Sequence, residues 1–369
     1  MMERYVFLDG RAEQLYHKDQ VEVIETYNFG EAGSAARVAF DNEEDIESVK
    51  NEVGDTVGIE KDFGDEFQVR NLGVMANENV ATIEDVKRLH KIPDSGAMGE
   101  GVHVVVMDSG IDGGHSLFAD KDIDHVDVTG RGQKDEVGHG TACAGQIVRI
   151  APRVKLTSLR IFGDSGRTSF DTILRAYEWL FSHSDEVDVV NMSWGAQRKV
   201  SQIDRLQNKL VNQGVRDVTA AGNTGDTGGS PATAEKAFSA GACTEEGKMA
   251  PFSSYNPNHD NPDVSAIGVN NRLAQASGTT MGENLSGPWV MASGTSFAAP
   301  ETSGSVARYL SNRDMSGLVE TYEANADDIK GIQKDGAGLL NHRATVGSEP
   351  EEPKPPEAGA TVWTLWADM

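Results

Sequence analysis

The chain has 369 residues, which is enough for one large α/β domain with an appendage or for two ordinary domains. Aspartate and glutamate outnumber lysine and arginine by 58 to 33, and the formal net charge is −25. Because phosphate groups bind to basic surfaces, this charge argues against nucleic acid and anionic membranes as partners. A net charge of −25 is compatible with an ordinary acidic protein. It is equally compatible with a halophilic protein, in which salt screens the repulsion between the acidic side chains, and composition does not separate the two.

Two cysteines, Cys143 and Cys243, exclude a disulfide framework and allow one bridge at most. The first residues hold only a short apolar run before charges appear, too short for the apolar core of a signal peptide. We therefore expect a cytoplasmic protein, or a secreted one if a leader has been trimmed. No later stretch of the sequence is apolar enough to predict a membrane span.

Residues 1–76 are predicted to form a small α+β module. One helix is predicted over 42–53, where Asn42 is the expected cap and glutamates fill the first turn. Strands are predicted on both sides of this helix in the sequence, over 4–10, 21–29, 36–40 and 55–63.

Residues 77–346 alternate strands with helices, which predicts a mostly parallel, doubly wound α/β sheet with helices on both faces. The run VHVVVMD, 102–108, is almost continuously apolar, as expected of a strand that is covered on both sides. Further strands are predicted over 154–162, 187–195, 215–223 and 237–243, and helices over 141–148, 170–183, 202–214 and 296–310.

The last segment, 347–369, begins with proline and glutamate and ends with two tryptophans. Its first half predicts an extended linker. The remainder is interpreted as a loose tail, with a docking peptide or the first strand of a missing domain as alternatives.

Three residues in the large region are candidates for one catalytic group, although each has a simpler interpretation. Asp108 ends the most apolar strand, where a turn or capping aspartate is the alternative. His139 lies between two glycines at an expected helix start, and its alternative is a structural histidine. Ser296 opens a helix among glycine, threonine and alanine, with Pro300 expected in the first turn, and its alternative is an ordinary N-cap serine.

Together the three residues have a common chemistry. A serine nucleophile needs a base to accept its proton, and a histidine base needs a carboxylate to fix its tautomer and stabilise its cation. The small residues around Ser296 leave room for a bulky substrate, and the start of a helix favours an oxyanion. Asn223 ends the sequence AAGN after another predicted strand, which makes its amide a candidate donor to that oxyanion.

Four motifs, DSGID at 108, GHGTACAG at 138, AAGN at 220 and GTSFAAP at 294, resemble in content and order those of the subtilisin-like serine proteases. The resemblance covers about residues 84–346 and implies a serine endopeptidase that forms an acyl-enzyme on Ser296. It implies Asp108 as the orienting acid, His139 as the general base and Asn223 as the oxyanion donor. It also implies substrate contacts from the SWG edge segment and from the opposite pocket wall: Ser193, Trp194, Gly195, Ala220, Ala221 and Gly222.

The first module resembles the inhibitory propeptide of the same family, although its first helix is short. This implies a self-processing zymogen that is cut between about Phe67 and Val80, with its own propeptide and polypeptide substrates as partners. We expect a monomer. An inactive protease-like binding protein is one alternative, but all four catalytic positions are filled. A nucleotide-binding protein is another, but the sequence has neither a P-loop nor a G-x-G-x-x-G after its first sheet strand.

Some positions depart from the family pattern. Ala142 and Glu301 stand where histidines are common, and Cys143 is expected beneath His139 as a small buried residue. The stretch CAGQIVRIAP leaves no room for the loop that usually wraps a strong calcium site, so we expect no metal ligands and no cofactor. The acidic segment 120–127 is an alternative cation site, but a solvated loop is the favoured interpretation.

Overall fold

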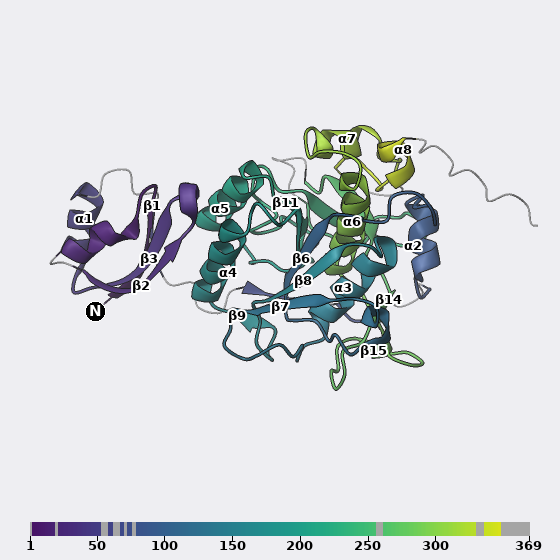
Figure 1. The fold of residues 1–369 in the computed structure, drawn as a ribbon, viewed down its shortest axis with the longest axis horizontal. Helices are drawn as coiled ribbons and strands as arrows, with labels where there is room; N and C mark the ends of the chain where they lie inside the picture. Colours follow the sequence, from purple (N-terminus) through teal and green to yellow (C-terminus); the bar gives the residue numbers. More distant parts are fainter. Residues whose placement is uncertain are drawn as a thin grey trace, which may run out of the picture.

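The computed structural model describes residues 2–18, 21–52, 58–61, 67–69, 72–75, 79–255, 261–329 and 336–347. A small module near the N-terminus packs against a larger α/β domain (Figure 1). The tail predicted over 347–369 lies, apart from Gly347, outside the described residues.

The centre of the large domain is a seven-stranded sheet in the order β13-β12-β11-β10-β6-β8-β7. Every neighbouring pair is parallel, which confirms the predicted fold class. The strands are β6 (His103–Asp108), β7 (Ile123–Asp127), β8 (Lys155–Arg160), β10 (Val189–Met192), β11 (Arg216–Ala220), β12 (Ser239–Cys243) and β13 (Val264–Ile267). From β6 the chain goes to β7 at one edge and returns to β8 beside β6, and from β10 it adds β11, β12 and β13 toward the other edge. The carboxyl ends of β6 and β10 therefore form the switch point of the sheet.

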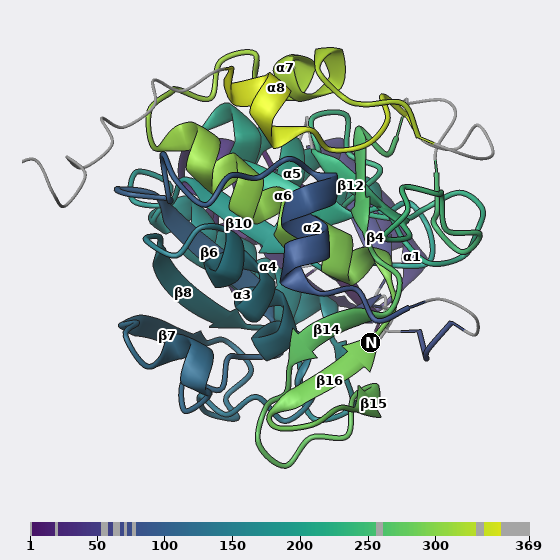
Figure 2. The same cartoon turned by 90° about the vertical axis from the view of Figure 1, so that its right-hand side faces the viewer.

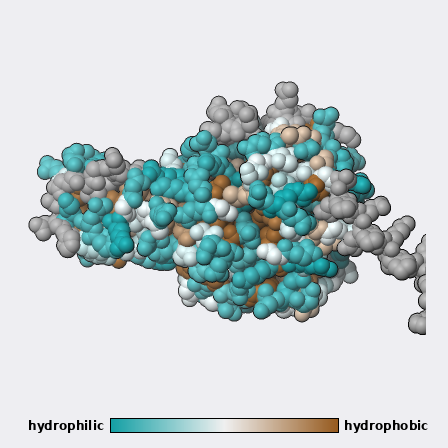
Figure 3. Space-filling model, turned by 45° about the horizontal axis from the view of Figure 1, so that its top comes forward, coloured by the Kyte–Doolittle hydropathy of each residue, from teal (hydrophilic) through white to brown (hydrophobic). Residues whose placement is uncertain are grey.

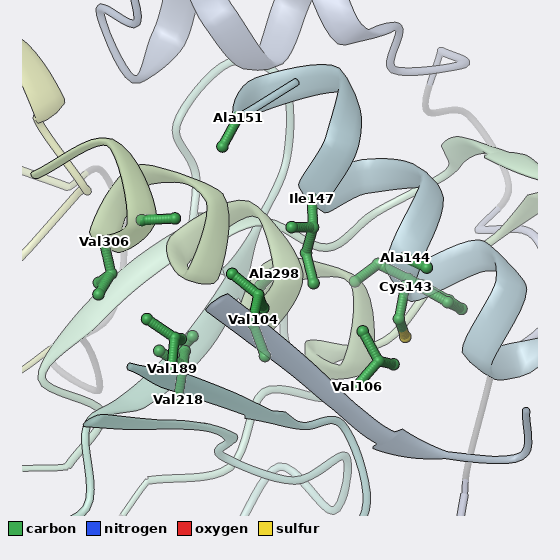
Figure 4. Close-up of a cluster of buried hydrophobic side chains, with 14 of the residues drawn as sticks. Val104, Val106, Cys143, Ala144, Ile147, Ala151, Val189, Val218, Ala298 and Val306 are labelled. Atoms are coloured by element: carbon green, nitrogen blue, oxygen red, sulfur yellow. The ribbon is translucent and has the colours of Figure 1, made fainter. Parts of the chain in front are cut away.

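Helices cover both faces of the sheet (Figure 2). On one face, α3 (His139–Ile150) and α6 (Thr295–Leu310) pack on alternate residues of β6, and Val104 and Val106 lie among their side chains (Figure 4). On the other face, α4 (Phe170–Ser182) and α5 (Ser201–Asn212) pack on the intervening residues, including Val105 and Met107. Because successive side chains of a strand point to opposite sides, an unbroken apolar run is required here.

The N-terminal module is an antiparallel sheet in the order β2-β3-β1-β4. Its strands are β1 (Met2–Leu8), β2 (Glu22–Asn28), β3 (Ser34–Phe40) and β4 (Gly58–Lys61). The α-helix α1 (Glu43–Glu52) begins after Asn42, whose Oδ1 accepts from Asp45 N at 3.0 Å, as predicted. The short first helix is a 3-10 turn, η1 (Ala12–His17), and a second such turn is η2 (Gly30–Ala32).

Both faces of the module sheet are buried. One face packs under α1 and η1 through Val6, Leu8 and Phe40. The other face, which includes Tyr5 and Phe7, packs against α4 and α5 of the large domain (Figure 1). The second face therefore depends on the large domain for its burial.

Several elements were not predicted. The segment 120–127, favoured as a solvated loop, contains the edge strand β7, so that interpretation was wrong. Its aspartates and histidine suit a strand poorly, but the ladder with β8 outweighs that propensity. The other additions are short: α2 (Ile83–Leu89), η3 (Ser116–Phe118), α7 (Leu318–Ala324), α8 (His342–Val346), a paired β5 (Phe67–Gln68) and β9 (Arg167–Thr168), and a small sheet of β14 (Asn271–Ala274), β15 (Glu283–Asn284) and β16 (Trp289–Ala292).

The surface is mainly hydrophilic on the face shown in Figure 3, with apolar atoms in small separate areas. Within the part of the chain that the structure describes, no helix combines the length and the apolar character needed to cross a membrane. Cys143 and Cys243 are both buried free thiols, so the one possible bridge is not formed.

Candidate active site

The candidate residues converge at the switch point of the sheet. Asp108 is the last residue of β6, and Ser193 directly follows β10. His139 is the first residue of α3, and Ser296 lies in the first turn of α6. His139 Nδ1 lies 2.9 Å from Asp108 Oδ1 and 3.0 Å from Asp108 Oδ2, and both side chains are fully buried.

Close backbone approach explains a glycine beside the histidine. A Cβ atom on Gly140 would lie 2.2 Å from the carbonyl oxygen of Gly110 and 3.2 Å from Asp108 Cβ. The start of α3 thus lies directly against the turn that follows β6. A side chain at position 140 would force these two segments apart, and Asp108 would lose its contact with His139.

Two opposing effects act on the pKa of His139. Burial alone would lower it, but the Asp108 carboxylate, with a smaller contribution from Cys143, holds the pKa of His139 well above its ordinary value. Among the described residues, its Nε2 atom has no hydrogen-bond partner. Cys143 lies under the ring as predicted, with Sγ 3.8 Å from His139 Nδ1, and burial raises the pKa of its thiol.

Ser296 is not the cap of its helix, so the ordinary N-cap interpretation was wrong. Gly294 occupies the cap position, and Ser296 Oγ instead donates to the carbonyl oxygen of Ser193 at 3.1 Å. Pro300 lies in the second turn rather than the first, and it has no N–H for the carbonyl oxygen of Ser296. That oxygen accepts from Ser193 Oγ at 2.9 Å and from Cys143 Sγ at 3.4 Å.

A pocket beside Ser296 contains all of the predicted substrate residues. Its lining includes Ser193, Trp194, Gly195, Ala220, Ala221, Gly222 and Asn223. Asn223 Oδ1 accepts from Thr295 N and from Thr295 Oγ1, both at 2.9 Å, which fixes the amide at the mouth of the pocket. The remaining wall is made of glycines and small polar residues: Thr224, Thr227, Gly228, Gly229 and Ser254.

The chain's own segment 67–69 lies along this pocket. Gln68 N donates to Gly195 O at 3.3 Å, and Gly195 N donates to Gln68 O at 3.2 Å. On the other side, β5 pairs with β9 in antiparallel fashion, and Val69 N donates to Gly166 O at 3.1 Å. The segment is thus the middle strand of a three-stranded arrangement whose outer strands belong to the large domain.

The same chain continues past the serine on the far side. Leu72 N donates to Ser293 O at 2.7 Å, and Ser293 N donates to Leu72 O at 3.1 Å. Phe67, at the start of the segment, is fully buried, stacked on Phe170 and edge-on to Trp194. Residues 67–69 and Leu72 therefore both form backbone hydrogen bonds with the large domain, and Leu72 does so with Ser293, three residues before Ser296.

Sequence analysis missed Asp135, a buried carboxylate that lies between the turn after Asp108 and the turn that leads into His139. Its oxygens accept from Ser109 Oγ, from Thr141 Oγ1 and from the backbone before and within the start of α3. The available signal was its place four residues before His139, because acids are favoured ahead of a helix N-terminus.

Glu301 replaces a histidine common in the family and is fully buried in α6. It accepts from Gln146 Nε2 and from Ile267 N, both at 3.0 Å, and His90 Nε2 lies 3.6 Å away. Burial raises the pKa of Glu301 to about 7. These partners come from α3, from β13 and from the residue that follows α2, and none of them is His139.

The expected lack of metal ligands stays a prediction. In the described ranges, one group of three potential ligands lies within 4.8 Å, and it is Asp108, His139 and Cys143 themselves. Three of the four acids of 120–127 have protein partners. Asp120 pairs with Lys121 at 2.9 Å and Asp124 with Lys155 at 3.4 Å. Asp127 accepts from Thr129 and Gly132.

The chain is similar in sequence and fold to known proteins. The chain is 28% identical to subtilisin NAT from Bacillus subtilis subsp. natto over 269 residues, which is 68% of this chain and 67% of the relative. It is 30% identical to a subtilisin-like protease from Coccidioides posadasii over 290 residues, or 75% of this chain and 68% of the relative. The fold matches fervidolysin from Fervidobacterium pennivorans with a TM-score of 0.74 and 19% identity, over 95% of this chain and 62% of that one. Residues 99–344, more than half of the chain, match the model of the subtilase family. The chain therefore belongs to this family of serine endopeptidases.

Proposed function

We propose that this chain hydrolyses peptide bonds through an acyl-enzyme on Ser296, with His139 as general base and Asp108 as its orienting acid. The observation that carries the proposal is the contact of His139 Nδ1 with both Asp108 oxygens, at 2.9 and 3.0 Å. A carboxylate at Nδ1 holds the proton there and leaves Nε2 to accept one from the serine. Digestion of casein tests the proposal. A serine-directed inhibitor should stop digestion, and its adduct should map to Ser296.

Each step uses groups at the switch point. Ser296 Oγ attacks the substrate carbonyl carbon while its proton passes to His139 Nε2, and the carbonyl oxygen becomes an oxyanion. The Asn223 amide and the Ser296 N–H stabilise that charge. His139 then gives the proton to the leaving amine as the C–N bond breaks. Water, activated by His139 in the same way, releases the acyl group and restores the serine hydroxyl.

Ser193 supplies the trigger that we propose for the first step. The Ser296 hydroxyl donates to the carbonyl oxygen of Ser193 at 3.1 Å rather than to His139. A substrate that pairs with the edge segment 193–195 offers a backbone N–H to that same oxygen. Substrate binding would then release the hydroxyl toward His139 Nε2, and such catalytic hydrogen bonds commonly tighten only in the complex.

We infer further that the chain is a zymogen that cuts itself in the segment 67–72. Gln68 and Val69 pair with the large domain on one side of Ser296, and Leu72 pairs with Ser293 on the other. This supports a substrate-like path for the segment, within the range of 67–80 expected from the sequence.

The register of backbone pairing predicts which peptide bond of the segment is cut. Gln68 pairs with Gly195, and the carbonyl of Ser193, two residues earlier in that segment, holds the Ser296 hydroxyl. An antiparallel ladder advances by two residues on both strands together, so the residue attacked should stand two positions after Gln68. The expected cut is therefore the bond between positions 70 and 71, residues that lie outside the described part of the chain.

The N-terminal module is the proposed inhibitor. Asp171 of α4 accepts hydrogen bonds from Tyr5 OH at 2.8 Å and Tyr27 OH at 2.5 Å, and it pairs with Arg37 at 2.8 Å. These contacts lie next to Phe170, whose ring also stacks on Phe67. After the cut, the same contacts should hold the module over the cleft.

Asp171→Ala should weaken the hold of the cleaved module on the processed domain. The change leaves two tyrosine hydroxyls and Arg37 without their common partner, and loss of one side of a buried charged contact typically costs about 2 kcal/mol or more. Gel filtration after processing measures the fraction of module that co-elutes with the domain. Glu178→Ala is the control, because Glu178 contacts Asn28 N at the exposed rim of the same interface. Equal co-elution of both variants and the unmodified chain would contradict the prediction.

Asn223→Ala should lower kcat by roughly a hundredfold to a thousandfold with little change in KM, the range known for the corresponding amide in subtilisin. The reason is that the amide meets the oxygen only once charge develops on it. Steady-state kinetics on a peptide substrate separate the two constants. Asn208→Ala is the control, because Asn208 accepts from Lys236 N at the exposed side of α5. A rise in KM at constant kcat would instead make Asn223 a substrate-positioning residue.

A further inference from the structure

We propose that Asp135 is a positioning residue that sets the distance and orientation between Asp108 and His139. This inference rests on the catalytic roles proposed above. Asp135 is only 1% exposed, and it lies in the turn that leads into α3. It touches none of the reacting atoms, so any effect on the reaction must pass through the two loops that it joins.

The carboxylate of Asp135 is saturated with donors from the His139 side. Oδ1 accepts from Gly138 N at 2.7 Å and Val137 N at 3.1 Å. Oδ2 accepts from Thr141 N at 3.0 Å and Thr141 Oγ1 at 2.6 Å. Several of these N–H groups belong to the first turn of a helix or precede it, where no helical carbonyl is available to them. Asp135 therefore fixes the backbone on both sides of His139.

The same carboxylate reaches the Asp108 side. Ser109 Oγ donates to Asp135 Oδ1 at 2.9 Å and accepts from Gly140 N at 2.9 Å. Ser109 N in turn donates to Asp108 Oδ1 at 2.7 Å. A continuous chain of hydrogen bonds thus runs from Asp135 through Ser109 to the oxygen that contacts His139 Nδ1.

A second connection closes the bridge. Thr141 Oγ1, which donates to Asp135, accepts from Asp112 N at 2.9 Å. A Cβ atom on Gly110 would lie 3.2 Å from Asp135 Cα, so the two loops also meet through their backbones. Five donors point at the two oxygens of Asp135, so both positions must be hydrogen-bond acceptors. A carboxylate has acceptors at both positions, whereas an amide has only one.

Asp135→Asn tests the proposal because the amide has the same shape but places an N–H₂ group where one set of donors points. We expect kcat to fall about tenfold to a hundredfold with little change in KM, a size typical of small misplacements of catalytic groups. The acidic limb of the pH profile of kcat/KM should also move to lower pH. The reason is that burial lowers the pKa of His139 whereas Asp108 raises it. A looser contact between Asp108 and His139 would raise this pKa by less. The other titrating group against His139 is Cys143.

The design separates positioning from folding. Rates are divided by the concentration of Ser296 that a serine-directed inhibitor labels, so that unfolded chains do not count. Asp127→Asn is the matched control, because Asp127 also accepts from a threonine and a glycine, and these partners include neither Asp108, Asp135 nor His139. Thr141→Val and Ser109→Ala remove one partner each and serve if Asp135→Asn does not fold. Both should move the pH limb in the same direction by less.

Two results would overturn the inference. The first is a kcat per labelled Ser296, and an acidic limb of the kcat/KM profile, that are both the same as in the unmodified chain. The second is a loss confined to the labelled fraction, which would make Asp135 a stabilising residue and nothing more. Failure of the inhibitor to label Ser296 in the unmodified chain would instead refute the proposed triad. The expected result is a fall in kcat and a shifted limb in Asp135→Asn, with neither in Asp127→Asn.

Discussion

Ser296→Ala should lower turnover by about six orders of magnitude, a figure that comes from subtilisin, and should leave the 39.6 kDa chain uncut. One hydroxyl is expected to attack both added substrates and the chain's own segment 67–72. Its removal should therefore abolish both reactions together. The substitution should hardly affect folding, because it removes only a hydroxyl that donates to Ser193 O and lines a pocket.

Intact-mass measurement of the purified proteins checks this result. The unmodified chain should yield a domain that begins at position 71, and Ser296→Ala should retain its original N-terminus. Ser182→Ala is the control, because Ser182 is an exposed serine at the end of α4 and should process normally. A Ser296→Ala chain that still shortens, free of other proteases, would remove Ser296 from the mechanism. A wild-type start outside 70–72 would leave the nucleophile in place but refute the pairing register.

Asp108→Asn should lower kcat/KM by about four orders of magnitude, as removal of the same group does in other serine proteases. An amide N–H₂ facing His139 Nδ1 would force the proton onto Nε2, the atom that must accept one. Because the error is in the tautomer, raising the pH should not restore activity. Asp188→Asn is the control, since Asp188 accepts from His103 N at the opposite end of the same strand.

The pH dependence follows from the same contact. In the unmodified chain the pKa of His139 is raised well above its ordinary value by Asp108, so kcat/KM should rise with pH into the alkaline range as the imidazole loses its proton. The raised pKa also means that the pair stabilises the fold below the unfolded pKa of about 6.5 and loses this contribution as pH rises through the native value. In Asp108→Asn, burial acts on the pKa of His139 without the opposing carboxylate and lowers it, so the stabilisation of the fold at acidic pH is lost. Thermal unfolding should then show that the variant is destabilised, relative to the unmodified chain, more at acidic than at alkaline pH.

Much of the site follows from local sequence. The apolar run before Asp108, the glycines around His139 and the small residues around Ser296 predict a strand end and two helix starts, and the structure contains all three. These features depend on residues a few positions apart, whose periodicity and turn chemistry are readable without a fold. Asn223 is a candidate because it ends a predicted strand, but 73 positions separate it from Ser296 and no local rule places a strand end beside a helix start.

Other features depended on contacts between distant segments. The segment 120–127 carries charges that predict a loop, yet β8 supplies a neighbouring ladder and makes it a strand. Pro300 was expected within about the first turn, where a missing N–H costs little, but it lies in the second turn. There Ser193 and Cys143 donate to the carbonyl oxygen of Ser296, which the proline leaves without a helical donor.

The sequence by itself determined the chemistry that we propose, because the candidate nucleophile, base and acid are set by residue type within short motifs. Only the tertiary structure decided how the residues are held and what fills the cleft. Asp135 is an unremarkable acid in the sequence and becomes a bridge between two loops when five donors from both loops converge on it. Gln68 and Leu72 carry no motif, and the cleft receives them through backbone hydrogen bonds. Backbone hydrogen bonds form almost independently of the side chains, so no residue pattern could predict this pairing.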